Sequence, residues 1–231
     1  MNERNHSDHQ SFLLHAIEHI LATPAEIKLN VQKLKQRYGK EDNKPWNTLN
    51  KVANKLIAVY STKAGLAGGA TAMIGIIPGL GTVVRVFGGT TADIALCLKY
   101  QIEMSMALAD LYGQDIENEY DKKTYFIIAG LGTINTEGYK QGGEQAAKLF
   151  TRTANRYLQN ASQDTVKILF RKVGITLSKK ALQKAIPFGI GAVIGFSSNK
   201  VLTWMVGQKV KAYFAAAAKR SVSYYRLIFK P

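Results

Sequence analysis

Two histidines and a glutamate near the start of the sequence have the spacing of a metal site. His15, Glu18 and His19 follow the order H-x-x-E-H, which is the pattern of inverted zinc peptidases. Histidines four residues apart on a helix can hold one metal ion, with the glutamate as a general base. The third ligand would be a distant carboxylate such as Glu103, because all four histidines lie before residue 20. Other carboxylates would serve equally well, and the polar face of a short amphipathic helix explains the same residues.

The glycines of the chain form no nucleotide-binding motif. The sequence has no G-K-[S/T] run, and no strand precedes a glycine-rich turn, so neither a P-loop nor a dinucleotide fingerprint is present. We predict no catalytic residue, no cofactor and no metal. A hydrolase or zinc-dependent enzyme that the sequence does not reveal is the third functional hypothesis.

Positive charge is concentrated in the last part of the chain. The protein has 31 lysines and arginines against 16 acidic residues, a net charge of +15, and from residue 144 onward 16 basic residues face two acids. The electric field of such a charged region attracts nucleic acid or an anionic membrane surface. Alternatively, the basic residues only keep the protein soluble. Because no helix-turn-helix, zinc or RNA-binding signature is present, nucleic acid is the less favoured partner.

Aromatic side chains accompany the basic ones in the final helical segment. This combination is typical of a helix that lies on anionic lipid. The predicted lipid contacts are Trp204, Lys209, Lys211, Lys219, Arg220, Tyr224, Tyr225, Arg226, Phe229 and Lys230.

Two apolar segments broken by glycine and proline dominate the rest of the sequence. Residues 64–84 and 185–199 contain no charged residue, and both place Ile-Pro before spaced glycines, which suggests a weak internal repeat. Proline ends or kinks a helix, and glycines four residues apart, such as Gly75 and Gly79, let helices approach closely. We expect paired helical arms that pack together, either dipping into the membrane surface or filling a soluble core. The structural residues predicted at these breaks are Pro78, Gly79, Gly81, Asp93, Pro187, Gly191, Gly195, Asn199 and Thr203.

Helical periodicity runs through the remaining sequence, and no strand-like alternation is present. Thr23, Pro24 and Glu26 form a helix-start signal with a capping box. Gly113 is expected to end a long helix. The predicted fold class is all-α, a helical bundle with two Gly/Pro-broken apolar helical segments. Helices are expected over residues 12–22, 23–38, 45–59, 125–135, 144–158, 163–184 and from 200 onward, with a long helix that ends at residue 111.

Two stretches resemble the EcsC family of bacterial proteins. They are DIALCLKYQIEMSMALADLYGQD, which follows an IPGLG segment, and KAIPFGIGAVIGFSSNKVLTWMVGQKVKAYF, and the resemblance covers roughly residues 52–214. In the second stretch, Trp204 and Met205 stand where basic residues are expected after Thr203. The resemblance implies a helical bacterial protein in the cytoplasm or at the inner membrane. The family's namesake is encoded beside an ABC transporter connected with protein secretion, and the resemblance implies no catalytic residues.

These observations predict an N-terminal helical extension over residues 1–44 and an EcsC-like helical domain over residues 45–231. The favoured function is a non-enzymatic, membrane-associated accessory protein that contacts anionic phospholipid and is linked to ABC transport or protein secretion. The alternative is a soluble helical bundle that binds a lipid or another apolar small molecule. Cys97 is the only cysteine and no signal peptide is apparent, which fits a reducing compartment. We expect a cytoplasmic or peripheral protein on the cytoplasmic face of the inner membrane, in preference to an integral one.

Overall fold

The computed structural model describes residues 13–38, 45–67, 74–134, 144–182 and 191–228. Within these ranges every regular element is a helix, so the all-α prediction is confirmed. A short helix over residues 13–20 comes first. It is followed by α2 (Pro24–Tyr38), α3 (Pro45–Leu66), α4 (Leu80–Phe87), α5 (Gly89–Leu111), α6 (Glu119–Ile134), α7 (Glu144–Gln159), α8 (Gln163–Leu182) and α9 (Gly191–Ile228).

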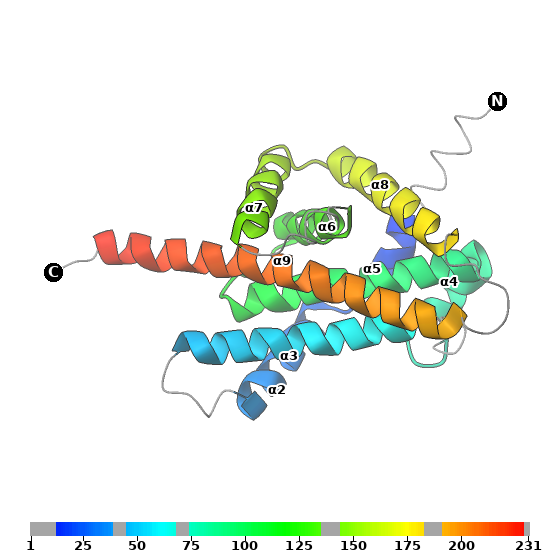
Figure 1. Cartoon of the computed structure of the whole chain (residues 1–231), viewed down its shortest axis with the longest axis horizontal. Coiled ribbons are helices and arrows are strands. Elements are labelled where there is room, and N and C mark those ends of the chain that lie inside the picture. Colours follow the sequence, from blue (N-terminus) through cyan, green and yellow to red (C-terminus); the bar gives the residue numbers. More distant parts are fainter. Residues whose placement is uncertain (1–12, 39–44, 68–73, 135–143, 183–190, 229–231) are drawn as a thin grey trace.

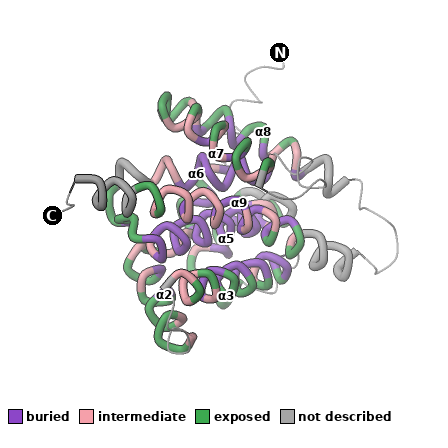
Figure 2. The backbone as a smooth tube through the Cα atoms, turned by 60° about the vertical axis from the view of Figure 1, so that its left-hand side comes forward, coloured by how far each residue is buried: buried purple, intermediate pink, exposed green. Residues whose placement is uncertain are grey.

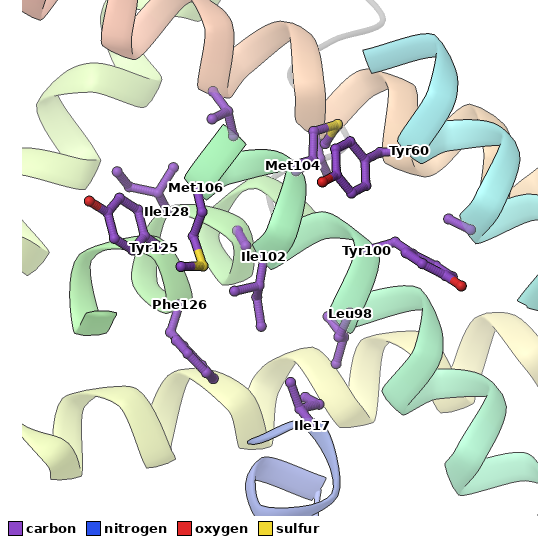
Figure 3. Packing of buried hydrophobic residues seen from close by; sticks show 14 of the residues in the cluster. Ile17, Tyr60, Leu98, Tyr100, Ile102, Met104, Met106, Tyr125, Phe126 and Ile128 are labelled. Atoms are coloured by element: carbon purple, nitrogen blue, oxygen red, sulfur yellow. The ribbon is translucent and has the colours of Figure 1, made fainter. Parts of the chain in front are cut away.

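Helix α5 is the centre of the bundle. Every residue from Ala95 to Ala109 is buried, and α5 contacts α2, α3, α4, α6, α8 and α9 (Figures 1 and 2). Side chains leave α5 on several sides: Met104 points toward Tyr60 of α3, and Met106 points toward Phe126 of α6 (Figure 3). A helix that is buried on all sides must satisfy each of its polar side chains internally.

The most extensive helix packing is between α3 and α9, which run antiparallel across the bundle (Figure 1). A Cβ atom added to Gly207 of α9 would lie 2.8 Å from Ile57 Cγ2 of α3 and 2.9 Å from Met104 Sδ of α5. Nearer the start of α3, Lys211 Nζ donates a hydrogen bond to Asn54 Oδ1 at 2.9 Å. The missing side chain at residue 207 therefore lets three helices meet.

Helices α7 and α8 form an outer layer over α6. Glycines in α6 again allow the approach: a Cβ atom on Gly130 would lie 2.9 Å from Leu169 Cδ2 of α8, and one on Gly132 would lie 2.8 Å from Val206 Cγ1 of α9. The sequence analysis did not single out these two glycines, because they stand inside an ordinary helical run without a proline.

The capping box at the start of α2 is confirmed. The backbone N–H of Glu26 donates to Thr23 Oγ1 at 3.3 Å, and the backbone N–H of Thr23 donates to Glu26 Oε2 at 2.8 Å. The backbone N–H and the hydroxyl of Thr23 both donate to the Glu26 carboxylate and lower the pKa of that carboxyl group.

Replacing Thr23 with alanine is expected to lower the free energy of unfolding by about 1 kcal/mol, because the first turn of α2 loses an accepting oxygen. Urea unfolding followed by circular dichroism measures the change. Thr153→Ala is the control, since the Thr153 hydroxyl donates to Leu149 O within an exposed part of α7 and leaves no helix donor unpaired. If Thr153→Ala lowered the free energy of unfolding as much as Thr23→Ala, the capping explanation would be contradicted.

The two broken apolar segments differ from the prediction. In the first, α3 continues to Leu66, residues 74–79 form turns, and α4 begins only after Gly79. A helix leading directly into Pro78 is therefore not formed over the described residues 74–77, because the turn requires the left-handed φ of +80° at Gly79. Gly75 makes no close helix contact, since an added Cβ would meet nothing within 4 Å.

In the second segment, α9 begins at Gly191, so the chain from residue 191 to residue 199 is already helical and continuous with the long final helix. The helix start predicted near residue 200 is wrong by about two and a half turns, because the glycines that suggested a break are accommodated within α9. Gly191 and Gly195 lie in its first turns, while Pro187 lies outside the described residues.

Candidate functional site

The H-x-x-E-H residues do not form a metal centre in the described structure. His15, Glu18 and His19 are all exposed on the helix over residues 13–20. Across the described residues, no three histidine, cysteine, aspartate or glutamate side chains are grouped closely enough to hold a metal ion. The ring of His19 packs near the backbone of Gly79, where an added Cβ would lie 3.0 Å from His19 Cδ2. These residues are the polar face of a short amphipathic helix whose other face buries Ile17 and Ile20.

Glu103, the carboxylate suggested as a third metal ligand, has other partners. It is buried in α5, forms an ion pair with Lys99 one helical turn earlier, and accepts a hydrogen bond from the backbone N–H of Ala22 at 2.8 Å. The carboxylate thus fastens the chain between residue 20 and α2 onto the central helix. Burial, together with the charge of Glu103, raises the pKa of the neighbouring Tyr100 to about 12.

A second polar cluster lies on the opposite side of α5. Gln101 Nε2 donates to Thr203 Oγ1 of α9 at 3.2 Å, and Thr133 Oγ1 of α6 donates to Gln101 Oε1 at 2.5 Å. All three side chains are buried. The amide therefore joins three helices through its two ends, which fixes their relative rotation as well as their separation.

Thr203, one of the structural residues predicted at the second break, lies within the continuous helix α9. Its hydroxyl accepts from Gln101 and lies 3.9 Å from Cys97 Sγ. Asn199 and Asp93 are half-buried on α9 and α5.

Lys209 is a correction to the predicted lipid contacts. Its side chain is only 1% exposed, and Nζ donates to the backbone oxygen of Gly132 at 3.1 Å. Gly132 lies in the last turn of α6, where carbonyl groups lack partners within the helix and where positive charge is favourable. Lys209 therefore holds α9 against the end of α6 and does not face the outside.

The other predicted lipid contacts do not gather in one place. Trp204 is exposed, while Lys211 is half-buried and bonded to Asn54. Lys219 and Arg220 are exposed, but they lie fifteen and sixteen residues beyond Trp204, about 22 to 24 Å along the helix axis. Lys219 also stands over the ring of Trp46, 5.3 Å from its centre. Of the remaining contacts, Tyr224, Tyr225 and Arg226 belong to α9 without described side chains, and Phe229 and Lys230 lie outside the described residues.

The elements that meet at one end of the molecule carry several exposed large apolar side chains. The C-terminal end of α3, the turn before α4, α4 itself and the N-terminal part of α9 lie together there (Figure 1). We call this region the α4 end. Its exposed large apolar residues are Leu66, Ile74, Ile76, Val86, Val201 and Trp204, with exposed fractions from 41% for Ile74 to 73% for Ile76.

The exposed charged side chains of α4 and of the first turns of α9 are cationic. Arg85 of α4 and Lys200 of α9 are both exposed, and the sequence has no acidic residue between position 64 and position 92 or anywhere in α9. Single exposed apolar side chains are normal on soluble proteins, whereas a contiguous apolar patch marks a surface that binds another body. The sequence analysis identified both apolar segments but did not predict which of their side chains face outward.

Helix α8 presents a second surface that the sequence analysis did not separate from the general positive charge. Its inner face buries Leu169, Phe170 and Val173, whereas Ile168 is 56% exposed and Ile175 is 48% exposed. The exposed basic residues around them are Lys167, Arg171 and Lys172. The signal was available in the sequence, because two isoleucines seven residues apart lie on one face of a helix.

Comparison with known proteins supports the resemblance noted in the sequence. Among the residues that the structure describes, every helix is too short or too polar to cross a membrane. No curated protein and no solved structure matches the chain. The model of the EcsC protein family matches residues 1–216, so the match includes the first 44 residues, which the quoted stretches did not cover. The chain therefore belongs to the EcsC family.

Proposed function

We propose that the protein is a non-enzymatic accessory protein that binds the surface of an anionic membrane through the α4 end. The observation that carries the proposal is that the elements meeting at that end expose six large apolar side chains and also carry the exposed Arg85 and Lys200. Apolar side chains enter the boundary between head groups and acyl chains, while lysine and arginine pair with anionic head groups. The exposed basic residues of α8 would add to the electrostatic attraction between the protein and an anionic membrane.

The proposed location is the cytoplasmic face of the inner membrane. This part of the proposal, like the link to an ABC transporter or to protein secretion, rests on the resemblance to the family and its namesake. A peripheral protein held at that face would be in reach of the cytoplasmic side of a membrane transporter. The α4 end supplies a reason for attachment without a membrane-spanning segment.

Vesicle binding tests the proposal. We expect the protein to co-sediment with vesicles containing phosphatidylglycerol, to bind phosphatidylcholine vesicles weakly, and to be released by salt. Replacing Ile76 with aspartate should lower the partition coefficient about tenfold, because one apolar contact is lost and a repelled charge is introduced. Leu29→Asp is the matched control, since Leu29 is 50% exposed on α2, outside the α4 end.

A spectroscopic measurement locates the contact. The protein has two tryptophans, so Trp46→Phe leaves Trp204 as the only indole. Its emission should shift to shorter wavelength when phosphatidylglycerol vesicles are added, because the indole leaves water. An unshifted emission, or equal binding by Ile76→Asp and the parent protein, would exclude the α4 end as the contact. Loss of binding only in a Lys219→Glu, Arg220→Glu variant would place the contact at the far end of α9.

A further inference from the structure

A cleft lies between the N-terminal residues and the outer layer. It is formed by residues 14–24, the beginnings of α6 and α8, and Met106 of α5, and its volume is about 680 Å³. Clefts that hold small molecules have volumes of roughly 300–1,000 Å³. The polar side chains of His15 and Glu18, which sequence spacing associated with zinc, line one wall of it.

The floor of the cleft is apolar and comes from four separate parts of the chain. Met106, Phe126 and Val166 are buried beneath it, with Phe126 held 5.5 Å from the ring of Phe170. Leu14, Leu21 and Ala22 are half-buried and complete the lining. Because these residues are fastened to the core, the floor is already formed in the protein without a ligand. Ala22 in particular is held through its backbone N–H by the buried Glu103.

The rim of the cleft carries an excess of positive charge. Lys122 and Lys123 come from α6 and Lys167 comes from α8, against the single carboxylate of Glu18. Lys167 has a carboxylate neighbour at 3.7 Å, Asp164, but both side chains are more than half exposed, so water weakens this pair. Lysine side chains suit the position because their carbon chains can cover apolar surface while the ammonium groups remain in water.

We propose that this cleft binds a single-chain anionic lipid of the fatty-acid type. The acyl chain would lie on the apolar floor, and the carboxylate would be held by the lysines of α6 and α8. An apolar floor with a cationic rim is complementary to such an amphiphile in both shape and charge. The volume suits one acyl chain with a compact head group. The cleft and the α4 end share no residue, so the proposal does not depend on membrane association.

Binding of cis-parinaric acid, a fluorescent fatty acid, tests the proposal at concentrations below micelle formation. We expect saturable binding at one site per chain, competed by palmitate and more weakly by the uncharged hexadecanol. Ala22→Phe fills the floor and should raise the dissociation constant at least about tenfold. Lys123→Glu reverses a charge at the rim and should raise the dissociation constant of the fatty acid. The dissociation constant of hexadecanol, obtained from competition, should stay unchanged. Lys148→Glu, an exposed change on α7, is the matched control and should have no effect.

A second floor variant keeps the test decisive if Ala22→Phe does not fold. Leu14→Trp narrows the cleft from the preceding helix and should weaken binding in the same direction, with circular dichroism confirming the fold. Absence of saturable binding by the folded parent protein would overturn the proposal, as would unchanged affinity in both folded floor variants. Ile76→Asp should bind cis-parinaric acid normally, and Ala22→Phe should bind vesicles normally. Failure of one site is therefore distinguishable from failure of the other.

Discussion

Replacing Lys209 with alanine is expected to lower the free energy of unfolding by about 3 kcal/mol. The substitution removes the donor that reaches Gly132 O at 3.1 Å and leaves that carbonyl group without this partner at the end of α6. It also removes the buried carbon chain of the lysine and leaves a cavity between α6 and α9. Both losses occur in a side chain that is 1% exposed. Urea unfolding followed by circular dichroism measures the change.

Two further variants separate the causes. Lys209→Met keeps most of the volume but not the hydrogen bond, and should lose about half as much stability as Lys209→Ala. Lys211→Ala is the control on the same helix, because its side chain is half-buried and its bond to Asn54 is exposed. We expect it to cost less than about 1 kcal/mol. An equal effect of Lys209→Ala and Lys211→Ala would mean that Lys209 does not hold the end of α6.

The charge of Lys209 predicts an exposed side chain, whereas the residue is buried. The residue was assigned to the lipid-facing set because a basic side chain near tryptophan is usually exposed. Its position on the helix indicates the opposite: Leu202, Val206 and Val210 recur at helical spacing and are buried, and residue 209 lies on that same face. A lysine on the apolar face of a helix indicates a buried partner, but no sequence pattern identifies the partner as Gly132 O.

Helix positions were predictable where local signals were strong. The capping box at Thr23 and Glu26 defines the start of α2, and the left-handed Gly113, at φ +85°, follows the end of α5. The glycine-rich segments were less predictable, because glycine is compatible both with a turn and with a tightly packed helix. Gly79 adopts a turn conformation that requires glycine, whereas Gly207 is helical and serves close packing. Only tertiary contacts distinguish these two uses.

The candidate sites were predictable only in part. Residue types indicated a basic protein with two apolar segments, and three of the six exposed apolar residues of the α4 end belong to the first of them. The cleft was not predicted, because its lining comes from residues 14–24, Met106, α6 and α8, which are far apart in the sequence. His15 and Glu18 were noticed for their spacing, but the neighbours that define their surroundings are lysines of distant helices.

Replacing Gly207 with valine is expected to lower the free energy of unfolding by about 3 kcal/mol. Even the first added carbon would lie 2.8 Å from Ile57 Cγ2 and 2.9 Å from both Ile57 Cγ1 and Met104 Sδ. Ile57 is branched at Cβ and moves only with difficulty, so α9 must separate from α3 and α5. Gly207→Ala should cost about 1 kcal/mol, since alanine's better helix propensity offsets part of the overlap.

The control for Gly207 is another helical glycine whose surroundings have room. Gly174 lies in α8, and a Cβ atom there would meet only Leu13 Cδ2, at 3.4 Å. Gly174→Ala should therefore raise stability by about 0.5 kcal/mol through helix propensity alone. If both alanine variants were stabilising, α3, α5 and α9 would not be packed as closely as the structure places them. A loss of stability in Gly207→Ala together with a gain in Gly174→Ala would show that glycine is required at residue 207 for close helix contact, independently of chain flexibility.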